Sequence, residues 1–218
     1  MYIEVVSFDA DRTIVSKGYV NRYWFGELPR LYGAKKGIDL EEAREQLTGY
    51  YNEIGDEDIR WYEPRYWFDR FDLDRDPADV IEKIQTPENL ELYQDAIDSI
   101  DELEGNFKLI VTSNAPRIFL DYALKDIESR FFGIYSCVSD FGEVKKHQGV
   151  YRRVLDLVET APENVVHVGD HWKFDYLVPR QLGIQTFFID RDGKRRGEGD
   201  GVVTDLRDMV GRIRNTGV

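Results

Sequence analysis

Two aspartates, Asp9 and Asp11, directly follow an apolar run over residues 2–8 and are separated by one residue. Side chains two residues apart in an extended chain project in the same direction, so these carboxylates can converge on one small volume. Two carboxylates held this close repel each other unless a cation or a shared proton relieves the repulsion. The pair therefore indicates metal or acid–base chemistry, although an aspartate that ends a strand and begins a turn gives the same pattern.

A second apolar run, over residues 109–111, leads into Thr112, Ser113 and Asn114. A hydroxyl and an amide at the end of a strand can donate hydrogen bonds to phosphate oxygens. Ser and Asn are also the preferred first residues of a helix, so a helix cap is the alternative interpretation of this triplet.

A pair of lysines, Lys145 and Lys146, follows the apolar run 135–138 after a short loop. One ammonium fixed beside several carboxylates would favour their charged forms and could bind a transferring phosphoryl group. Two solvated surface lysines would have the same sequence, and adjacency leaves the choice between Lys145 and Lys146 open.

The apolar run 165–168 ends in Gly169 and Asp170, and Asp175 follows at the start of a predicted helix. Glycine lets the backbone approach closely, and Asp175 can turn back toward Asp170. Such carboxylates suit a hard cation with oxygen ligands, while a strand end followed by a helix cap is the alternative. The histidines lack the spacing of a zinc site, and His167 is expected to be hydrogen-bonded within its strand.

These residues need a scaffold that brings the ends of distant strands together. Strand-like runs alternate with helical periodicity from residue 86 onward, which predicts an α/β fold with a doubly wound parallel sheet of Rossmann type. The carboxyl ends of such strands meet at one edge of the sheet. Strands are predicted over residues 2–8, 107–111, 135–138, 165–168 and 186–189. Helices are predicted over residues 86–105, 116–127, 148–159, 175–182 and 205–213, with no regular element over 190–201.

The sequence pattern differs over residues 16–85, because this segment lacks strand-like runs and contains helix signals instead. Asp39 precedes apolar residues spaced three and four apart, and Asp76 with Pro77 is typical of a helix start. We expect residues 1–15 and 86–218 to form the catalytic core. Residues 16–85 are expected to form an inserted, all-helical cap domain over the end of the first strand.

An aromatic cluster stands out in this insertion between residues 61 and 71. One interpretation is the core of a small helical bundle. The other is a lid that lines a substrate pocket, with an arginine of the same stretch meeting an anion. The arginines in question are Arg60, Arg65 and Arg70.

Composition limits the class of protein. The chain carries 42 acidic and 29 basic residues, a net charge of −13, which disfavours nucleic acid and anionic membranes as partners. No apolar stretch is long enough to span a membrane, and the N-terminal segment with Glu4 does not have the pattern of a signal peptide. The single cysteine, Cys137, excludes an internal disulfide and a cysteine metal cluster. A cytoplasmic protein is the expectation.

Taken in order, these motifs resemble those of the haloacid dehalogenase superfamily, chiefly its phosphatases with a helical cap. The first family motif, Asp-x-Asp-x-Thr, is matched by Asp9, Asp11 and Thr13. The remaining three motifs have their counterparts in order along nearly the whole chain. They are matched by Ser113 (or Thr112) before Asn114, by Lys145, and by Gly169, Asp170 and Asp175.

The resemblance implies a Mg²⁺-dependent phosphatase that hydrolyses a small phosphorylated metabolite through an aspartyl-phosphate. It implies Asp9 as the nucleophile and Asp11 as the acid and base, with Lys145 as the third catalytic residue. The implied substrate-binding residues are Ser113, Asn114 and Thr13. The implied metal ligands are Asp9, the Asp11 backbone carbonyl and Asp170. Asp175 is implied either to bind the metal as well or to contact a residue that binds it.

Three departures from the family pattern bear on the site. Arg12 stands where glycine is usual, Lys146 replaces the usual proline, and Pro179 falls in the helix after the fourth motif. That proline is tolerable only in the first turn of a helix. Two other functions remain: a haloacid dehalogenase, which in the family pattern needs no metal and lacks the acid at the position of Asp11, and a non-catalytic phosphate- or protein-binding relative.

Overall fold

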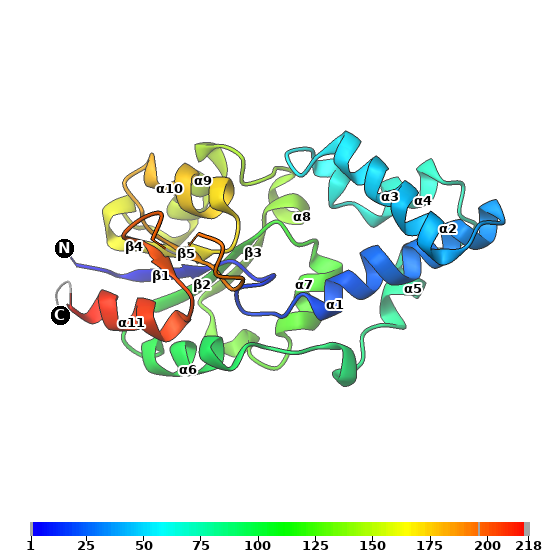
Figure 1. Ribbon diagram of the computed structural model, residues 1–218. Coiled ribbons are helices and arrows are strands. Elements are labelled where there is room, and N and C mark those ends of the chain that lie inside the picture. Colours follow the sequence, from blue (N-terminus) through cyan, green and yellow to red (C-terminus); the bar gives the residue numbers. More distant parts are fainter. Residues whose placement is uncertain (1, 196, 216–218) are drawn as a thin grey trace.

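The computed structural model describes residues 2–195 and 197–215, and its centre is a parallel sheet (Figure 1). In the described chain the sheet has six strands in the order β3-β2-β1-β4-β5-β6, and every pair is parallel. The strands are β1 (Val5–Phe8), β2 (Lys108–Ser113), β3 (Gly133–Ser136), β4 (Val165–Gly169), β5 (Gln185–Ile189) and β6 (Val202–Val203). The doubly wound parallel sheet predicted from the alternating pattern is confirmed.

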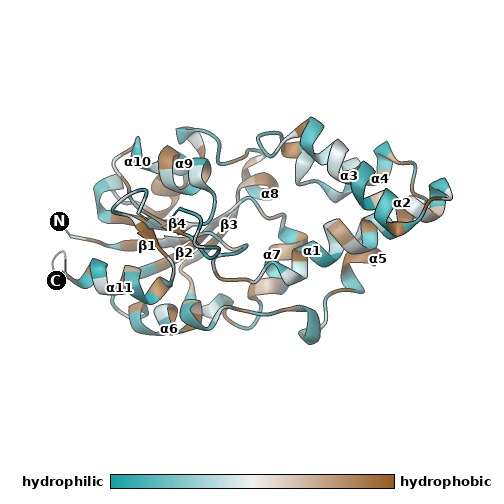
Figure 2. Cartoon of the chain, in the orientation of Figure 1, coloured by the Kyte–Doolittle hydropathy of each residue, from teal (hydrophilic) through white to brown (hydrophobic). Residues whose placement is uncertain are grey.

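Helices cover both faces of the sheet because successive strand residues point to opposite sides. Val5 packs with α9 (Gln148–Val158) and α10 (Val178–Arg180). Val6 belongs to a second cluster on the other face, with α6 (Gln94–Leu103), α7 (Arg117–Leu124) and α11 (Leu206–Asn215). In Figure 2, α6 and α11 carry both hydrophilic and hydrophobic colours, as expected for helices with one buried face.

Several element boundaries differ from the sequence prediction. The strand expected over residues 135–138 ends at Ser136, whose side chain caps α8 (Cys137–Phe141) by accepting from the Ser139 N–H at 3.1 Å. The helix expected from residue 86 starts only at Gln94, after the short 3₁₀ helix η3 (Pro87–Asn89). Strand β6 lies just beyond the loop expected over residues 190–201 and was missed because two residues are too short for a detectable alternation.

The segment after β4 begins as a π-helix, η6 (Trp172–Leu177), and continues as α10. Pro179 is the second residue of α10, but α10 continues η6 without a break, so this proline does not lie in the first turn of the helical segment. The condition that the sequence placed on Pro179 is therefore not met. The Phe174 carbonyl, five residues earlier in the π-helix, accepts instead from the Tyr151 hydroxyl at 2.7 Å, so the N–H that proline lacks leaves no carbonyl unpaired there.

Between β1 and β2 the chain forms a group of helices that lies beyond the carboxyl ends of the strands, while the start of β1 and the end of α11 lie at the opposite end (Figure 1). Side-chain caps start three of these helices: Asp39 accepts from the Glu42 N–H at 2.9 Å, Asp58 from the Arg60 N–H at 3.0 Å and Asp76 from the Ala78 N–H at 2.8 Å. The bounds are α1 (Gly18–Arg22), π-helix η1 (Tyr23–Glu27), α2 (Leu28–Lys36), α3 (Leu40–Ile54), η2 (Ile59–Trp61), α4 (Pro64–Arg70) and α5 (Pro77–Glu82). Among the described helices, none has the length and apolar character that crossing a bilayer requires.

Candidate active site

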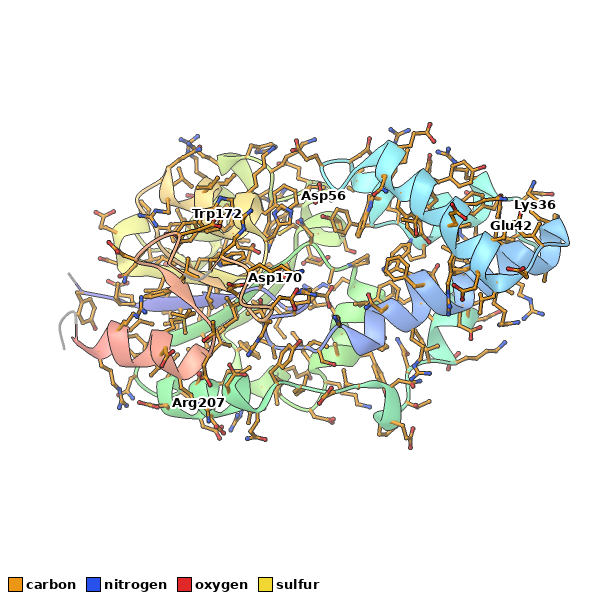
Figure 3. The ribbon with its side chains drawn as sticks, viewed as in Figure 1. Lys36, Glu42, Asp56, Asp170, Trp172 and Arg207 are labelled. Atoms are coloured by element: carbon orange, nitrogen blue, oxygen red, sulfur yellow. The ribbon has the colours of Figure 1, made fainter. Side chains whose placement is uncertain are left out.

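A cavity of about 200 Å³ opens at the carboxyl ends of β1, β2 and β4, between the sheet and the inserted helices. Asp9, Ser113 and Asp170, at or just after the ends of these strands, line it, as do Lys145 and Asp175. Figure 3 shows Asp170 near the centre of the molecule, with the loop that carries Asp56 on the side of the inserted helices. Residues more than 100 positions apart thus meet because parallel strands end at one edge.

Lys145 is the cation at the centre of this cavity. Its ammonium, with a side chain only 2% exposed, donates to Asp9 Oδ1 at 2.7 Å, Asp175 Oδ1 at 2.6 Å and the Thr112 carbonyl at 2.9 Å. Burial opposes the charge of Lys145, but Asp175 and Asp9 outweigh it and hold the lysine pKa well above its ordinary value. Lys146 instead points away and donates to the Glu57 carbonyl at 2.7 Å. The structure therefore brings Lys145, and not Lys146, to the carboxylates.

Asp175 is held on every side by hydrogen bonds. Its Oδ1 receives Lys145 and lies 3.2 Å from His167 Nε2, while its Oδ2 accepts from the His171 N–H at 2.9 Å. Burial would raise the pKa of Asp175, but Lys145 and His167 overcome that effect and lower it. Gly169 permits this approach, since a Cβ there would lie 2.4 Å from Asp175 Cγ. Asp175 is therefore a fixed anion that anchors the lysine.

His167 continues this buried network under the cavity. Its Nδ1 lies 2.8 Å from the Ser7 hydroxyl and its Nε2 3.2 Å from the Tyr151 hydroxyl. Burial lowers the pKa of His167, and both ring nitrogens have hydrogen-bond partners, as the sequence suggested for a strand histidine. The supporting roles of Ser7 and Tyr151 had no sequence signal, because neither belongs to a recognisable motif.

Arg12 adopts the left-handed backbone conformation, with φ of +59°, at the position where the family pattern has glycine. That conformation costs a non-glycine residue roughly 1–2 kcal/mol. The side chain bridges two carboxylates, with Nε donating to Asp170 Oδ2 at 2.7 Å and Nη2 to Asp192 Oδ2 at 3.1 Å. The turn after Asp9 is therefore kept, and Arg12 adds a cation next to Asp170.

The carboxylates of this cavity fit a divalent metal. Asp9, Asp170 and Asp175 each place an oxygen within 4.8 Å of the others. Burial, with Asp9 and Asp175 nearby, raises the pKa of Asp170 to about 8, and burial also raises that of Asp9 despite Lys145. This excess of negative charge is what a bound cation would relieve. Because both Asp175 oxygens are already hydrogen-bonded, Asp9 and Asp170 are the carboxylates better placed to bind the metal directly.

Asp11 lies on the wall of the same cavity, two residues after the nucleophile candidate. Burial, with the charge of Asp9 added, raises the pKa of Asp11 to about 7. A carboxyl group with a pKa near neutrality can both give and take a proton at physiological pH. The two aspartates of the first motif therefore differ in their surroundings: Asp9 is bound to Lys145, whereas Asp11 forms no ion pair with any residue that the structure describes.

The raised pKa of Asp11 predicts a pH dependence of stability. Between about pH 4 and pH 7 the folded state binds more protons at Asp11 than the unfolded state does, so stability falls as pH rises. Asp11→Asn removes this titration. In EDTA, wild type should lose on the order of 2 kcal/mol of unfolding free energy relative to Asp11→Asn between pH 4.5 and 7.5, measured by urea unfolding. If the difference in unfolding free energy between the two proteins did not change with pH, the raised pKa of Asp11 would be contradicted. His167 is present in both proteins, so its titration cancels in the comparison.

The three residues predicted to bind substrate lie in different places. Ser113 and Asn114 line the cavity, and the Asn114 side chain links two elements: its Oδ1 accepts from the Lys145 N–H at 3.0 Å and its Nδ2 donates to the Tyr62 hydroxyl at 3.2 Å. Thr13 is fully buried and is not among the residues that line the cavity in the described chain. Its role as a substrate contact stays a prediction without geometric support.

Part of the aromatic cluster of the insertion forms a helical core and part lines the cavity, so each of the two interpretations holds for some of its residues. Trp67 and Phe68 are buried in the core, whereas Trp61 and Tyr62 line the cavity. The arginines considered as anion contacts do not line it: Arg60 pairs with Asp58, Arg65 with Asp76 and Arg70 with Glu53.

Contacts also join the loop after α3 to the core. His171 Nε2 lies 3.0 Å from Asp56 Oδ2, and Lys173 forms an ion pair with Glu57. Together with the Lys146 contact to the Glu57 carbonyl, these bonds hold the inserted helices over the cavity. Asp56 was not recognised in the sequence, because its partner is 115 residues away.

Comparison with known proteins gives a consistent picture. A family model described as a haloacid dehalogenase-like hydrolase matches residues 3–183. Haloacid dehalogenase-like hydrolase domain-containing protein 3 of Xenopus laevis is 28% identical over 96 residues, which are 44% of this chain and 38% of that protein. GMP/IMP nucleotidase YrfG of Escherichia coli (strain K12) is 29% identical over 72 residues, 33% of this chain and 32% of that protein. The chain thus matches between about a third and two fifths of the length of these relatives.

Solved structures resemble the whole chain. A HAD phosphatase from Thermococcus onnurineus superposes with a TM-score of 0.85 at 22% identity, covering 97% of this chain and 98% of that one. A putative HAD-hydrolase from Bacillus subtilis, YfnB, bound to magnesium, has a TM-score of 0.71 at 18% identity, with 98% and 99% covered. At this level of identity the likeness establishes a shared fold.

Proposed function

Because the chain belongs to the haloacid dehalogenase-like hydrolase family, we propose that it is a Mg²⁺-dependent phosphatase that hydrolyses a small phosphate monoester. The observation that carries the proposal is the presence of Asp11, with a pKa of about 7, on the wall of the cavity that holds Asp9. An alcohol is a poor leaving group unless it receives a proton, so ester hydrolysis needs an acid at this place. A dehalogenase releases halide and has no use for one.

Asp9 is the nucleophile. Its carboxylate oxygen attacks the phosphorus and the bond from phosphorus to the alcohol oxygen breaks, which leaves an aspartyl-phosphate on Asp9. Asp11 gives its proton to the departing alcohol oxygen and then takes a proton from the water that attacks the aspartyl-phosphate. That water releases phosphate and restores the Asp9 carboxylate.

Lys145, Ser113 and Asn114 surround the position of the transferred group. A phosphoryl group carries its charge on three outer oxygens, so fixed donors on several sides contribute most to the rate. Lys145 is fixed by Asp9 and Asp175, and the Asn114 amide retains a second hydrogen beyond the one that it gives to Tyr62. These contacts support a site that is organised before the substrate arrives.

The proposed ligands of Mg²⁺ are the side chains of Asp9 and Asp170 and the backbone carbonyl of Asp11. Asp175 lies next to them as a fixed anion that does not itself bind the ion. When bound, the ion offsets the repulsion between the nucleophile and a dianionic phosphate. Arg12 holds one oxygen of Asp170 at 2.7 Å, which leaves the other oxygen for the metal.

We assign residues 1–15 and 86–218 to the catalytic core and residues 16–85 to a cap that excludes water during transfer. Bonds of the Asp56–Glu57 loop to His171 and Lys173 support this assignment. The substrate is a small phosphorylated metabolite, in line with the nucleotidase named among the relatives, and the acidic chain is expected to work in the cytoplasm without nucleic acid or membrane partners.

The class of reaction is tested with an aryl phosphate such as p-nitrophenyl phosphate. Wild type should hydrolyse it with Mg²⁺, lose activity in EDTA and regain it when Mg²⁺ is restored in excess, because the carboxylate charge then has its cation again. Phosphate release measures the reaction. Chloride release from 2-chloropropionate, without hydrolysis of any phosphate ester, would show a dehalogenase instead.

A further inference from the structure

A second cavity, of about 210 Å³, adjoins the first and shares Asp11, Trp61, Tyr62 and Ala115 with it. Asp11 is therefore on the wall of both, with the reacting carboxylates on one side and this second space on the other. Aromatic rings dominate the wall of the second cavity, five from the segment between β1 and α5 and one from α7. They are Trp24, Phe25, Tyr51, Trp61, Tyr62 and Phe119.

The aromatic rings of this wall pack against one another. The Trp24 ring lies 6.0 Å from that of Trp61, 5.9 Å from that of Tyr51 and 6.2 Å from that of Phe119, measured between centroids. The Tyr51 hydroxyl donates to the Trp24 carbonyl at 3.1 Å, and Trp67 Nε1 donates to the Trp61 carbonyl at 3.1 Å. Trp24 also stands on the π-helix η1, a rare element that is frequent at functional sites.

The edge of the second cavity is polar and partly exposed. Lys17 and Asn21 line it, and the Lys17 ammonium forms no ion pair with a carboxylate among residues 2–195 and 197–215. Arg12 lines it as well, next to Asp11. An aromatic wall with a few polar groups at the rim is the usual composition of a small-molecule site.

We infer that this second cavity binds the alcohol part of the phosphate ester, and that it selects an alcohol that carries a flat aromatic ring. The inference rests on the proposed function, since Asp11 must protonate the ester oxygen at the junction of the two cavities. A flat ring can pack against the tryptophans in the offset or edge-to-face geometries that aromatic pairs prefer. The volume suffices for one ring with small substituents, because a cavity of about 150 Å³ accommodates benzene.

The test compares esters whose alcohols leave equally well. Benzyl phosphate and ethyl phosphate release alcohols of similar acidity, so a difference in kcat/KM reports binding of the ring rather than chemistry. Wild type should prefer benzyl phosphate by about 100-fold or more, as expected when several ring carbons enter an apolar pocket. Cyclohexylmethyl phosphate, which has similar bulk without a flat ring, should fall between the two.

Trp24→Leu should reduce the preference for benzyl phosphate about 10-fold while kcat/KM for ethyl phosphate stays near wild type, because Trp24 lines the second cavity and not the first. Phe132→Leu is the matched control, because Phe132 is 59% exposed and precedes β3 at the far end of the sheet. A second measurement uses wild type alone, so it does not depend on whether a variant folds. The ligand is benzylphosphonate, whose carbon–phosphorus bond is not hydrolysed. Calorimetry with Mg²⁺ present should show that wild type binds it at least 10-fold more tightly than methylphosphonate.

The outcomes separate this inference from the proposed function. Equal kcat/KM for the benzyl and ethyl esters, with equal binding of the two phosphonates, overturns the aromatic preference and leaves the phosphatase intact. Tight and selective binding of benzylphosphonate by a protein that hydrolyses no phosphate ester supports the aromatic site and overturns the phosphatase.

Discussion

Asp9→Asn should lose turnover by about 10⁴-fold or more, because no carboxylate remains to form the covalent intermediate. Asp9 is placed for in-line attack by its position at the end of β1, where its backbone N–H donates to the Val168 carbonyl at 2.8 Å and its Oδ1 meets Lys145. A nucleophile needs such rigidity, since the attacking oxygen must lie in line with the leaving group at about 3 Å.

Asp11→Asn should behave differently, because it removes a proton carrier and leaves the nucleophile and the backbone carbonyl unchanged. With an aryl ester, whose leaving group needs little protonation, phosphorylation of Asp9 should continue. The water that must attack the aspartyl-phosphate then has no base, so the phosphorylated enzyme accumulates. The affinity of Asp11→Asn for Mg²⁺, measured by calorimetry, should remain within a few-fold of that of wild type.

The measurement is mass spectrometry after acid quench, with the adduct located by peptide mapping. Wild type should show a trace of adduct, Asp11→Asn a large fraction, and Asp9→Asn none. An adduct on Asp11, or one that persists in Asp9→Asn, would reverse the two roles.

The second large effect is expected at the lysine pair. Lys145→Met removes the ammonium that bridges Asp9 and Asp175, and kcat should fall by about 10²- to 10³-fold, the usual cost of losing one fixed electrostatic donor. The two carboxylates are then buried without their cation, so unfolding free energy should fall by about 3–5 kcal/mol. Steady-state kinetics and urea unfolding measure the two effects.

Lys146→Met is the matched control one residue away. Its ammonium is exposed and donates to the Glu57 carbonyl, so the change should cost at most about 1 kcal/mol of stability and leave kcat near wild type. Lys145→Met/Asp175→Asn removes a charge of each sign and should recover part of the lost stability without recovering activity. An inactive Lys146→Met beside an active Lys145→Met would contradict the assignment.

The order of the motifs and the fold could be predicted from the sequence because they depend on local patterns. Strand-like runs alternating with helical periodicity predicted the doubly wound sheet, whose register then brings Asp9 and Asp170 together. The spacing of Asp9 and Asp11 predicted two carboxylates at one strand end.

Other features depend on packing between distant segments, which local patterns do not encode. Lys145 and Lys146 are neighbours with identical side chains, and only burial against Asp9 and Asp175 distinguishes them. The same holds in the insertion, where Trp67 packs into the core and Trp61 faces the cavity.

Arg12 is the clearest case of a feature that the tertiary structure decided. The sequence showed only that a glycine position holds an arginine. In the fold its guanidinium meets Asp170, 158 residues further along, and Asp192, 180 residues further along. Sequence alone indicated which polar side chains follow the strands, because the alternation of strand and helix patterns along the chain is local. The tertiary structure decided which of them are paired, buried or open to a ligand, because those properties depend on long-range contacts.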